Sequence, residues 1–597
     1  MMDKLGTLKR VFGHDSFREG QERLIDALLS GRDVLGIMPT GAGKSICYQL
    51  PGLLLEGIAL VVSPLISLMK DQVMSLKAMG VAAAYINSSL NPAQQTEALR
   101  RAALGTYKII YVAPERLNTP QFLSFVQNAN LSLLAVDEAH CVSQWGQDFR
   151  PSYLRIPEFI RSLPKRPPVA AFTATATERV REDILKWLGL QNPVQAVTGY
   201  NRSNLFFRSV KPSNRFAWLC EFLEDQKGNC GIIYCNTRKN VEEVCGLLQE
   251  NGLPATRYHA GLSDQERKTN QEDFQYDRSR IMVATNAFGM GIDKPDVRFV
   301  VHYNMPLSME NYYQEAGRAG RDGLPSQCVL LYSGQDVVTG DWLIDHGDPN
   351  PDLTNEEQDQ VRKLAHERLK QMTFYANSKT CLRNRILRYF GEPEFQHSCE
   401  SCSVCLGYPF EEDSGAGRPS RASAEERARR KEARLLREEK RETRHETKAS
   451  DLSSWEKALF ESLKTLRLLI ANQEHVPAYV IFSDATLLAM VKKKPSTGSA
   501  LLEVSGVGNV KMEKYGRVFL SVLARGKDPD TAFQEEYLNL SNQPEETNQS
   551  SRPWDEDEDE ALIAAVMYRF SVEDLALAHD RTPEEIEKRL RMLVTRK

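Results

Sequence analysis

The sequence lacks long apolar runs and has no excess of charge of either sign. No run of roughly 18 apolar residues occurs among its 597 residues, so the sequence predicts no membrane span. Residues 1–10 hold no apolar signal core, which predicts a protein that is not secreted. Lys and Arg total 76 against 80 Asp and Glu, which excludes a uniformly basic, histone-like protein. Local basic patches for nucleic acid remain compatible with this balance.

The chain has no excess of cysteine, and its apolar content is not low. Hydrophobic residues make up 41% and charged residues 26% of the chain, which excludes wholesale disorder. At roughly 150 residues per domain, the length predicts about four domains. Of the 11 cysteines, the four at 381, 399, 402 and 405 lie close together in the sequence. In a reducing cytoplasm such a cluster predicts a metal site rather than disulfides.

Residues 1–340 alternate short β-branched or Leu-rich runs with helical patterns. This alternation is typical of parallel sheets buried on both faces. Two series of runs predict an α/β fold of two tandem parallel-sheet lobes rather than one large sheet. Residues 362–390 are predicted to be helical. The expected strands are Val34–Ile37, Leu60–Val62, Ile109–Val112, Leu133–Val136 and Val169–Phe172, then Gly231–Tyr234, Ile281–Ala284, Phe299–His302 and Val329–Tyr332.

The C-terminal third changes composition several times. Residues 418–448 are rich in Arg, Lys and Glu, which predicts a solvated helix or disordered linker or, alternatively, a basic arm that tracks DNA. Residues 553–597 are predicted to form three short helices that bind either DNA or protein. We therefore divide the chain into two lobes (1–205 and 206–340), a helical metal-binding module (341–408), a charged linker (409–450), a small helical domain (451–527), an acidic polar linker (528–552) and a helix-turn-helix-like module (553–597).

A glycine-rich segment, Met38-Pro-Thr40-Gly41-Ala-Gly43-Lys44-Ser45, follows a predicted strand and opens a predicted helix. The glycines let backbone N–H groups surround a phosphate, Lys44 reaches the β- and γ-phosphates, and Ser45 can ligate Mg²⁺. Met38 stands where the strict pattern has glycine. The alternative is an ordinary glycine turn between strand and helix.

Two further segments carry charge suited to phosphoryl transfer. Asp137 and Glu138 end a buried strand, where Asp137 can hold Mg²⁺ and Glu138 can polarise the attacking water. Arg318 and Arg321 are expected on one face of a helix, aimed at a γ-phosphate. Taken alone, the arginines would also fit a surface helix.

Together these motifs resemble superfamily 2 helicases and, in detail, the RecQ family of DNA helicases. Phe17-Arg18-Glu-Gly-Gln21 is similar to that family's adenine-reading element, and His14 stands where the family usually has an aromatic residue. The resemblance implies nucleotide contacts from His14, Arg18, Gln21, Thr40, Gly291, Asp293 and Gln314. It implies DNA contacts from Ser63, Lys70, Arg116, Asn236, Thr237, Arg238 and His259.

The segment after Asp137-Glu138 is the stretch most specific to this resemblance. It looks like the aromatic-rich loop of RecQ enzymes, and in it Trp145 and Phe149 offer stacking platforms for bases beside Gln144 and Arg150. A loop at this position would couple DNA occupancy to hydrolysis. The alternative is that Trp145 is a core residue.

The four clustered cysteines, Cys381, Cys399, Cys402 and Cys405, suit a tetrahedral zinc site, although an iron–sulfur cluster also uses four thiolates. The resemblance to RecQ enzymes favours structural zinc. RecQ enzymes commonly carry a winged-helix domain next, but the charged stretch that follows here is too poor in apolar residues to bury a core. We therefore predict a short form without it.

Residues 455–524 resemble the helicase-and-RNase-D C-terminal domain. Gly506 and Gly508 are expected to present N–H groups to a phosphate, and Tyr479 to stack on a DNA base. The alternative is that these are packing features.

The sequence as a whole predicts an ATP-dependent DNA helicase that uses ATP, Mg²⁺ and Zn²⁺. The resemblance implies 3′-to-5′ translocation on single-stranded DNA, unwinding of tailed or branched duplexes in repair and recombination, and a monomer in the bacterial cytoplasm near the nucleoid. A single-stranded-DNA-binding protein is an expected partner, and a nuclear location stays open. The rival interpretations are an RNA helicase or non-unwinding translocase, and a DNA-binding scaffold without activity.

Overall fold

The computed structural model describes residues 3–143, 150–288, 294–347, 354–412, 452–474, 476–525, 586 and 589. The chain divides into two compact units, Met1–Asn87 with Gly105–Asp528, and Ser88–Leu104 with Pro529–Lys597. In the second unit the described helix is α5 (Pro92–Ala103), which begins with a capping box at Asn91. Predictions about Gln144, Trp145, Phe149, Gly291 and Asp293 lie outside the described residues, as do those about residues 413–450, the acidic linker and the C-terminal module apart from residues 586 and 589.

The first lobe is built on a seven-stranded parallel sheet in the order β3-β4-β2-β5-β6-β1-β7. All five expected strands are present. The two that the sequence did not reveal lie at the edges, where only part of each strand is buried and the apolar signal is weaker. The strands are β1 (Val34–Ile37), β2 (Ile58–Val62), β3 (Ala83–Ile86), β4 (Ile109–Val112), β5 (Leu131–Val136), β6 (Val169–Thr173) and β7 (Val194–Val197).

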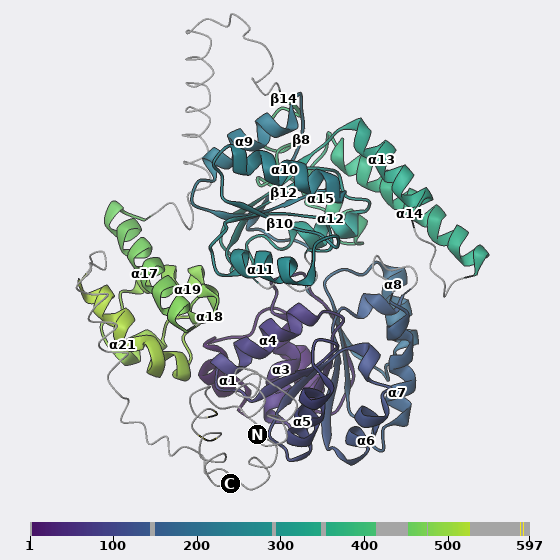
Figure 1. Ribbon diagram of the computed structural model, residues 1–597, viewed down its shortest axis with the longest axis vertical. Helices are drawn as coiled ribbons and strands as arrows, with labels where there is room; N and C mark the ends of the chain where they lie inside the picture. The colour runs from purple at the N-terminus through teal and green to yellow at the C-terminus, as the bar shows by residue number, and fades with distance from the viewer. Residues whose placement is uncertain are drawn as a thin grey trace, which may run out of the picture. The chain divides into compact units, whose positions relative to one another are not determined.

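Helices connect these strands and cover the sheet (Figure 1). The central strands are buried along their whole length, since the crossovers place helices on both faces. The main helices are α2 (Gln21–Leu29), α3 (Lys44–Leu54), α4 (Ile66–Ala78), α6 (Pro120–Asn128), α7 (Ile156–Ser162) and α8 (Glu178–Trp187), preceded by α1 (Lys4–Thr7) and the π-helical turn Leu8–Phe12.

The second lobe repeats this design with its strands in the order β10-β11-β9-β12-β13-β8-β14. The four expected strands are present, and the sequence missed the remaining three. The strands are β8 (Leu205–Pro212), β9 (Cys230–Tyr234), β10 (Ala255–Tyr258), β11 (Ile281–Ala284), β12 (Val297–His302), β13 (Ser326–Leu331) and β14 (Glu411–Glu412), with helices α9 (Arg215–Asp225), α10 (Arg238–Glu250), α11 (Asp264–Gln275) and α12 (Met309–Ala316).

The cysteine cluster is attached to the second lobe through β8. Helices α13 (Gly334–Asp345), α14 (Asn355–Ala376) and α15 (Leu382–Tyr389) precede it, so the single helical stretch expected over 362–390 is two helices. Phe207 of β8 forms a parallel bridge with Cys402, and its carbonyl accepts the Ser403 N–H at 2.8 Å. Strand β14 then pairs with the end of β8, so residues 411–412, assigned to the linker from the sequence, complete this sheet.

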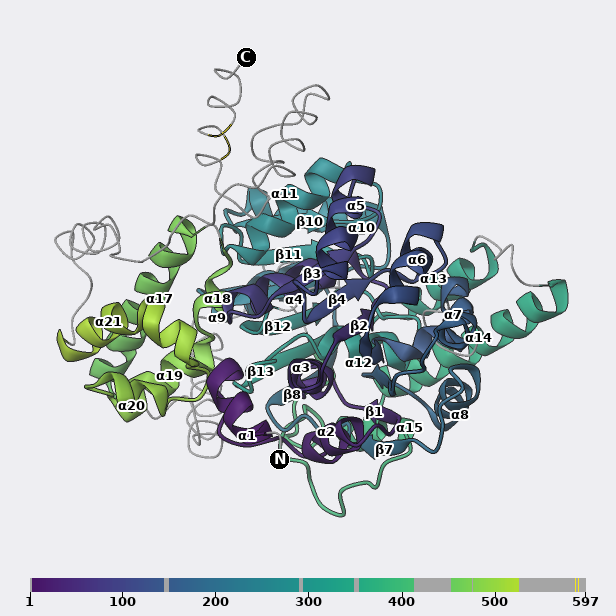
Figure 2. The same cartoon turned by 90° about the horizontal axis from the view of Figure 1, so that it is seen from below.

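A helical bundle, residues 452–525, follows. Its long first helix packs against α18, α19 and α21 (Figure 2). Among the described residues no helix is long and apolar enough to cross a membrane. The helices are α17 (Ser454–Gln473), α18 (Ala478–Ile481), α19 (Asp484–Lys493), α20 (Gly498–Leu502) and α21 (Asn509–Arg525).

Candidate nucleotide site and metal centre

A cavity of about 350 Å³ gathers most of the residues that the sequence assigned to nucleotide binding and hydrolysis. Its wall contains the glycine-rich loop and the two acids of the first lobe, and the two arginines of the second. The predicted residues that line it are His14, Arg18, Thr40, Gly41, Gly43, Lys44, Ser45, Asp137, Glu138, Gln314, Arg318, Arg321 and Tyr479.

The glycine-rich loop joins β1 to α3 and bends at two left-handed glycines. Gly41 has φ +83° and Gly43 has φ +81°, a region that residues with a Cβ rarely adopt. Gly43 caps α3, so the N-terminal N–H groups of this helix face the cavity, which suits a phosphate. Met38, in place of the usual glycine, is fully buried and continues the strand pairing through its N–H to the Thr173 carbonyl at 3.0 Å. This departure therefore leaves the bend intact.

The two acids follow β5 directly. Lys44 Nζ lies 3.8 Å from Glu138 Oε1, and His140 Nδ1 lies 3.3 Å from Glu138 Oε2. Burial alone would raise the pKa of Glu138, but the Lys44 ammonium and the His140 ring outweigh it and hold that pKa low. Burial and the neighbouring Glu138 carboxylate raise the pKa of Asp137. An ionised Glu138 beside the cavity is the form that can polarise a water molecule.

The two arginines do not share a helix, contrary to the expectation. Helix α12 ends at Ala316, and Arg318 and Arg321 lie in the turns that follow, which the glycines at 317, 320 and 323 favour. Both side chains still line the cavity. Arg318 is 6% exposed, and its Nε has no hydrogen-bond partner among the described residues. A buried guanidinium with a spare donor suits an anionic phosphate in this cavity.

The predicted adenine-reading residues divide into two groups. His14 and Arg18 line the cavity. Burial, and to a lesser extent the positive charge of Arg18, lowers the pKa of His14 to about 4, so the His14 ring is neutral at pH 7. Arg18 donates to the Gly41 carbonyl. Gln21 Nε2 donates to the Ala42 and Gly43 carbonyls, both at 3.1 Å, so its amide supports the glycine-rich loop. The sequence had suggested that this amide reads the adenine edge.

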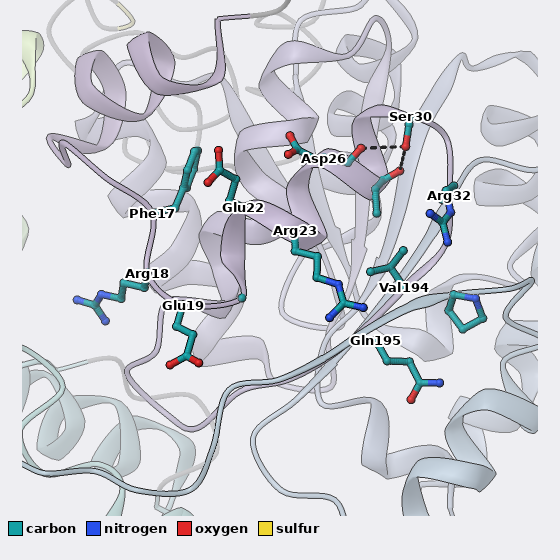
Figure 3. A pocket seen from close by; sticks show the side chains of 13 residues that line it. Phe17, Arg18, Glu19, Glu22, Arg23, Asp26, Ser30, Arg32, Val194 and Gln195 are labelled. Carbon is teal, nitrogen blue, oxygen red and sulfur yellow. Dashed lines mark hydrogen bonds between the residues drawn. The ribbon is translucent and has the colours of Figure 1, made fainter.

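A second, open hollow lies along α2 (Figure 3). Its lining combines Arg18, Arg23 and Arg32 with three acids, Glu19, Glu22 and Asp26. In Figure 3 Arg18 extends away from Arg23 and Arg32. Mixed charge of this kind does not match a polyphosphate, so the cavity at the glycine-rich loop is the candidate nucleotide site.

Arg202 is a site residue that the sequence analysis missed. It lies between β7 and β8, and its guanidinium donates to the carbonyls of Thr40, Gly317, Ala319 and Gly320. Thr40 belongs to the glycine-rich loop and the other three to the arginine-bearing turn. A lone Arg in a loop offers no periodic or motif signal, so only the tertiary structure reveals it.

The predicted DNA-contacting residues stand after the carboxyl ends of several strands, in differing environments. Lys70 and Arg238 are exposed, and Arg116 is half-buried. Arg150 donates to the Pro64 carbonyl. The remaining four are engaged or enclosed in the fold: Asn236 donates to the Met305 carbonyl, Thr237 caps α10, His259 lies 2.7 Å from Glu242, and Ser63 is fully buried.

Tyr479 lies in the nucleotide cavity, and Lys294 Nζ stands 5.9 Å from its ring centre. The neighbouring glycine turn contacts the first lobe, where the Gly506 N–H donates to the Gly13 carbonyl at 2.7 Å. A Cβ on Gly508 would lie 2.9 Å from the Arg10 and Val11 carbonyl oxygens. The Gly506 N–H that the sequence offered to a phosphate is thus bonded to the first lobe in this structure.

The four clustered cysteines converge. The Sγ atoms of Cys381, Cys399, Cys402 and Cys405 all lie within 4.8 Å of one another. Sulfur atoms about 2.3 Å from a central Zn²⁺ in a tetrahedron have separations of this order. The donor set therefore fits a closed structural zinc site.

Two parallel-sheet lobes whose phosphate loop, acids and arginines line one cavity have the architecture of an enzyme that hydrolyses nucleoside triphosphates. The chain matches the model of the DEAD/DEAH box helicase over residues 18–184, the helicase conserved C-terminal domain over 214–323, the RecQ zinc-binding module over 334–406 and the HRDC domain over 456–523. These matches agree with the lobes, the cysteine module and the helical bundle, which we call the HRDC domain from here on.

Curated relatives match most of the chain in single alignments. The ATP-dependent DNA helicase RecQ of Bacillus subtilis is 38% identical over 86% of this chain and 97% of its own length. The protein of the same name from Pasteurella multocida is 36% identical over 88% and 94% respectively. The chain belongs to the RecQ family: it is an ATP-dependent DNA helicase whose cofactors are ATP, Mg²⁺ and Zn²⁺. The matched zinc-binding module ends at residue 406 and the matched HRDC domain begins at residue 456, so the predicted charged linker lies between them.

Proposed function

We propose that the enzyme translocates 3′-to-5′ on single-stranded DNA and separates tailed or branched duplexes during repair and recombination. The cavity that combines the glycine-rich loop, Asp137, Glu138 and the two arginines carries the proposal. The polarity and the cellular role are expectations from the family. So are the bacterial cytoplasm and nucleoid as its location, a monomeric state, and a single-stranded-DNA-binding protein as partner.

Each cavity residue takes a role in hydrolysis. Lys44 binds the β- and γ-phosphates, and Ser45 and Asp137 would hold Mg²⁺, which neutralises phosphate charge. Glu138, kept ionised by Lys44 and His140, orients and polarises the attacking water. Arg318 and Arg321 stabilise the charge that develops on the transferred phosphoryl group. Because these groups come from two lobes, turnover changes the contacts between the lobes and so moves the bound strand.

A strand-displacement assay tests the proposal. Duplexes with a 3′ tail, a 5′ tail or no tail are compared in DNA and in RNA, each with and without ATP and Mg²⁺. We expect ATP-dependent separation of the 3′-tailed DNA. Separation of the 5′-tailed DNA alone would reverse the polarity, and ATP hydrolysis without separation of any duplex would indicate a translocase that does not unwind.

A further inference from the structure

Arg202 has a hydrogen-bonding pattern that spans the two lobes. Its Nη1 donates to the Thr40 carbonyl of the glycine-rich loop at 2.5 Å and to the Gly317 carbonyl of the arginine-bearing turn at 3.2 Å. Its Nη2 donates to the Ala319 and Gly320 carbonyls at 3.0 and 2.7 Å. Nε bonds Asn204 Oδ1 at 3.3 Å, so all three nitrogens of the guanidinium have acceptors.

This arrangement places a cation without a neutralising acid beside the nucleotide cavity. Among the described residues no carboxylate pairs with Arg202; its acceptors are carbonyl and amide oxygens. Burial, with Arg321 and Arg18 nearby, lowers the pKa of Arg202. Such a site is tolerated when the geometry is fixed and an anion lies close by. A polyphosphate in the cavity would supply that anion.

The loop and the turn that Arg202 joins are themselves in close contact. A Cβ on Gly41 would lie 3.2 Å from Arg321 Cα and 3.4 Å from Arg202 Nη1. A Cβ on Gly317 would lie 3.4 Å from the Thr40 side chain. Glycine at position 41 allows the loop backbone to approach the turn backbone, and the guanidinium then holds the two in register.

Arg202 is itself held by the zinc-binding module. Arg383, which is 2% exposed, donates to the carbonyl of Arg202 at 2.7 Å and to Asn201 Oδ1 at 2.6 Å. Its other nitrogen donates to the Leu205 carbonyl and to Ser401 Oγ, between two of the clustered cysteines. In the same connector the Glu392 carboxylate accepts the Tyr200 N–H. The zinc-binding module thus fixes the segment from which Arg202 extends.

We propose that Arg202 is a positioning residue that sets Arg318 and Arg321 against the phosphate loop, and that the zinc-binding module holds it in place through Arg383. The inference rests on the proposed roles of those two arginines. Arg202 then acts on the reaction through them. It follows that the zinc-binding module supports catalysis as well as stability, through one side-chain contact.

The test compares Arg202→Gln, Arg202→Lys and Arg321→Ala with the double variant in the full-length protein. We expect Arg202→Gln to lower kcat of DNA-stimulated hydrolysis by about 10²-fold, because a misplacement of about 1 Å has effects of this size. The Kd for ADP–Mg²⁺ should change only a few-fold. Arg202→Lys should recover little, because an ammonium lacks the planar fork. In the Arg321→Ala background, Arg202→Gln should have a much smaller effect.

Arg215→Gln is the matched control. Arg215 forms a partly buried ion pair with Asp336 in the second lobe, and it does not line the nucleotide cavity. This control should lower the melting temperature without changing kcat per folded enzyme. Arg383→Met should lower kcat in the same direction as Arg202→Gln while elemental analysis still finds zinc.

Two outcomes would overturn the inference. One is full additivity of Arg202→Gln and Arg321→Ala, which would mean that Arg202 does not act through the turn. The other is an Arg202→Gln enzyme with lower thermal stability and unchanged kcat, as for the control. If Arg321→Ala alone keeps normal turnover, the proposed function of the arginines fails instead, and the two failures are distinguishable.

Discussion

The two lobes have the same sheet topology and different chemistry. Strand for strand, β3-β4-β2-β5-β6-β1-β7 corresponds to β10-β11-β9-β12-β13-β8-β14. In the first lobe β1 ends in the glycine-rich loop, whereas in the second β8 continues to Pro212 and pairs with β14. The first lobe places Asp137 after β5, and the second places Tyr303 and Asn304 after β12. The scaffold therefore does not determine the chemistry; the residues that follow each strand do.

The comparison also shows why the site needs both lobes. The first lobe provides the glycine-rich loop, the two acids and one cavity-lining arginine, Arg18. The second lobe provides the other two cavity-lining arginines, Arg318 and Arg321. The second lobe has no counterpart of the glycine-rich loop at the end of β8. With the roles proposed for these residues, hydrolysis requires the two sheets to be correctly placed, which a single lobe cannot provide.

The largest expected effect comes from removing the phosphate-binding cation of the first lobe. Lys44→Ala should abolish ATP turnover, because nothing else in the loop carries a positive charge toward the β- and γ-phosphates. Binding to single-stranded DNA should be largely retained. Phosphate release and fluorescence anisotropy measure the two properties. Normal turnover in this variant would mean that the cavity is not the hydrolytic site.

Removing the corresponding charge of the second lobe should have the next largest effect. Arg321→Ala should reduce kcat by on the order of 10³-fold, the size seen for arginine fingers. ADP affinity should fall much less, since the charge that Arg321 stabilises develops in the transition state. Steady-state kinetics and ADP titration separate these effects. Equal losses in both would assign Arg321 to ground-state binding.

The zinc site is expected to govern stability of the second lobe. Cys402→Ser removes a fully buried ligand beside β8, and structural zinc contributes roughly 10–16 kcal/mol of apparent binding free energy in small domains. We expect loss of zinc, a lower melting temperature and protease sensitivity in residues 341–412. Elemental analysis and limited proteolysis check this. A wild-type protein without zinc would contradict the assignment.

Strand β14 allows a finer test of the second sheet. Glu412 accepts a hydrogen bond from Trp218 Nε1 at 2.7 Å and pairs with Arg208, and its carbonyl accepts the Ser213 N–H. Fragment 1–412 should therefore melt a few degrees above fragment 1–408, as expected from about 1–3 kcal/mol of lost hydrogen bonds. Both fragments should unwind short duplexes. Equal melting temperatures would show that β14 adds nothing.

The smallest effect concerns the contact between the HRDC domain and the first lobe. Gly508→Ala adds a Cβ that would collide with the Arg10 and Val11 carbonyls, while the φ of Gly508 is not left-handed. The HRDC domain should fold normally and lose its contact. Hydrogen exchange of residues 8–14 should then increase by a modest factor. Trp455→Ala, at an exposed position on α17, is the control.

Much of the fold follows from local patterns in the sequence. Strands buried along their whole length read as continuous apolar runs and were predicted, whereas β8, an inner strand whose residues alternate between buried and partly exposed, was missed. The short edge strands β3, β7 and β10 carry mixed residues and were not predicted. The predicted Asp137, Glu138, Lys44 and Ser45 meet in one cavity, because parallel strands end at the same edge of a sheet.

The sequence by itself determined the chemical inventory: a phosphate loop, two acids, two arginines and four thiolates at recognisable spacings. Only the tertiary structure decided how these groups are held. In the structure the two arginines lie in a turn after α12 rather than on a helix face, and the Gln21 amide donates to the backbone of the glycine-rich loop. Tyr479 lines the cavity, and Arg202 bonds residues of both lobes. Motifs are local, and the sequence records them. Contacts between residues far apart in the sequence, such as Gln21 with Ala42 and Arg202 with Thr40, depend on how the elements pack, and no local pattern encodes them.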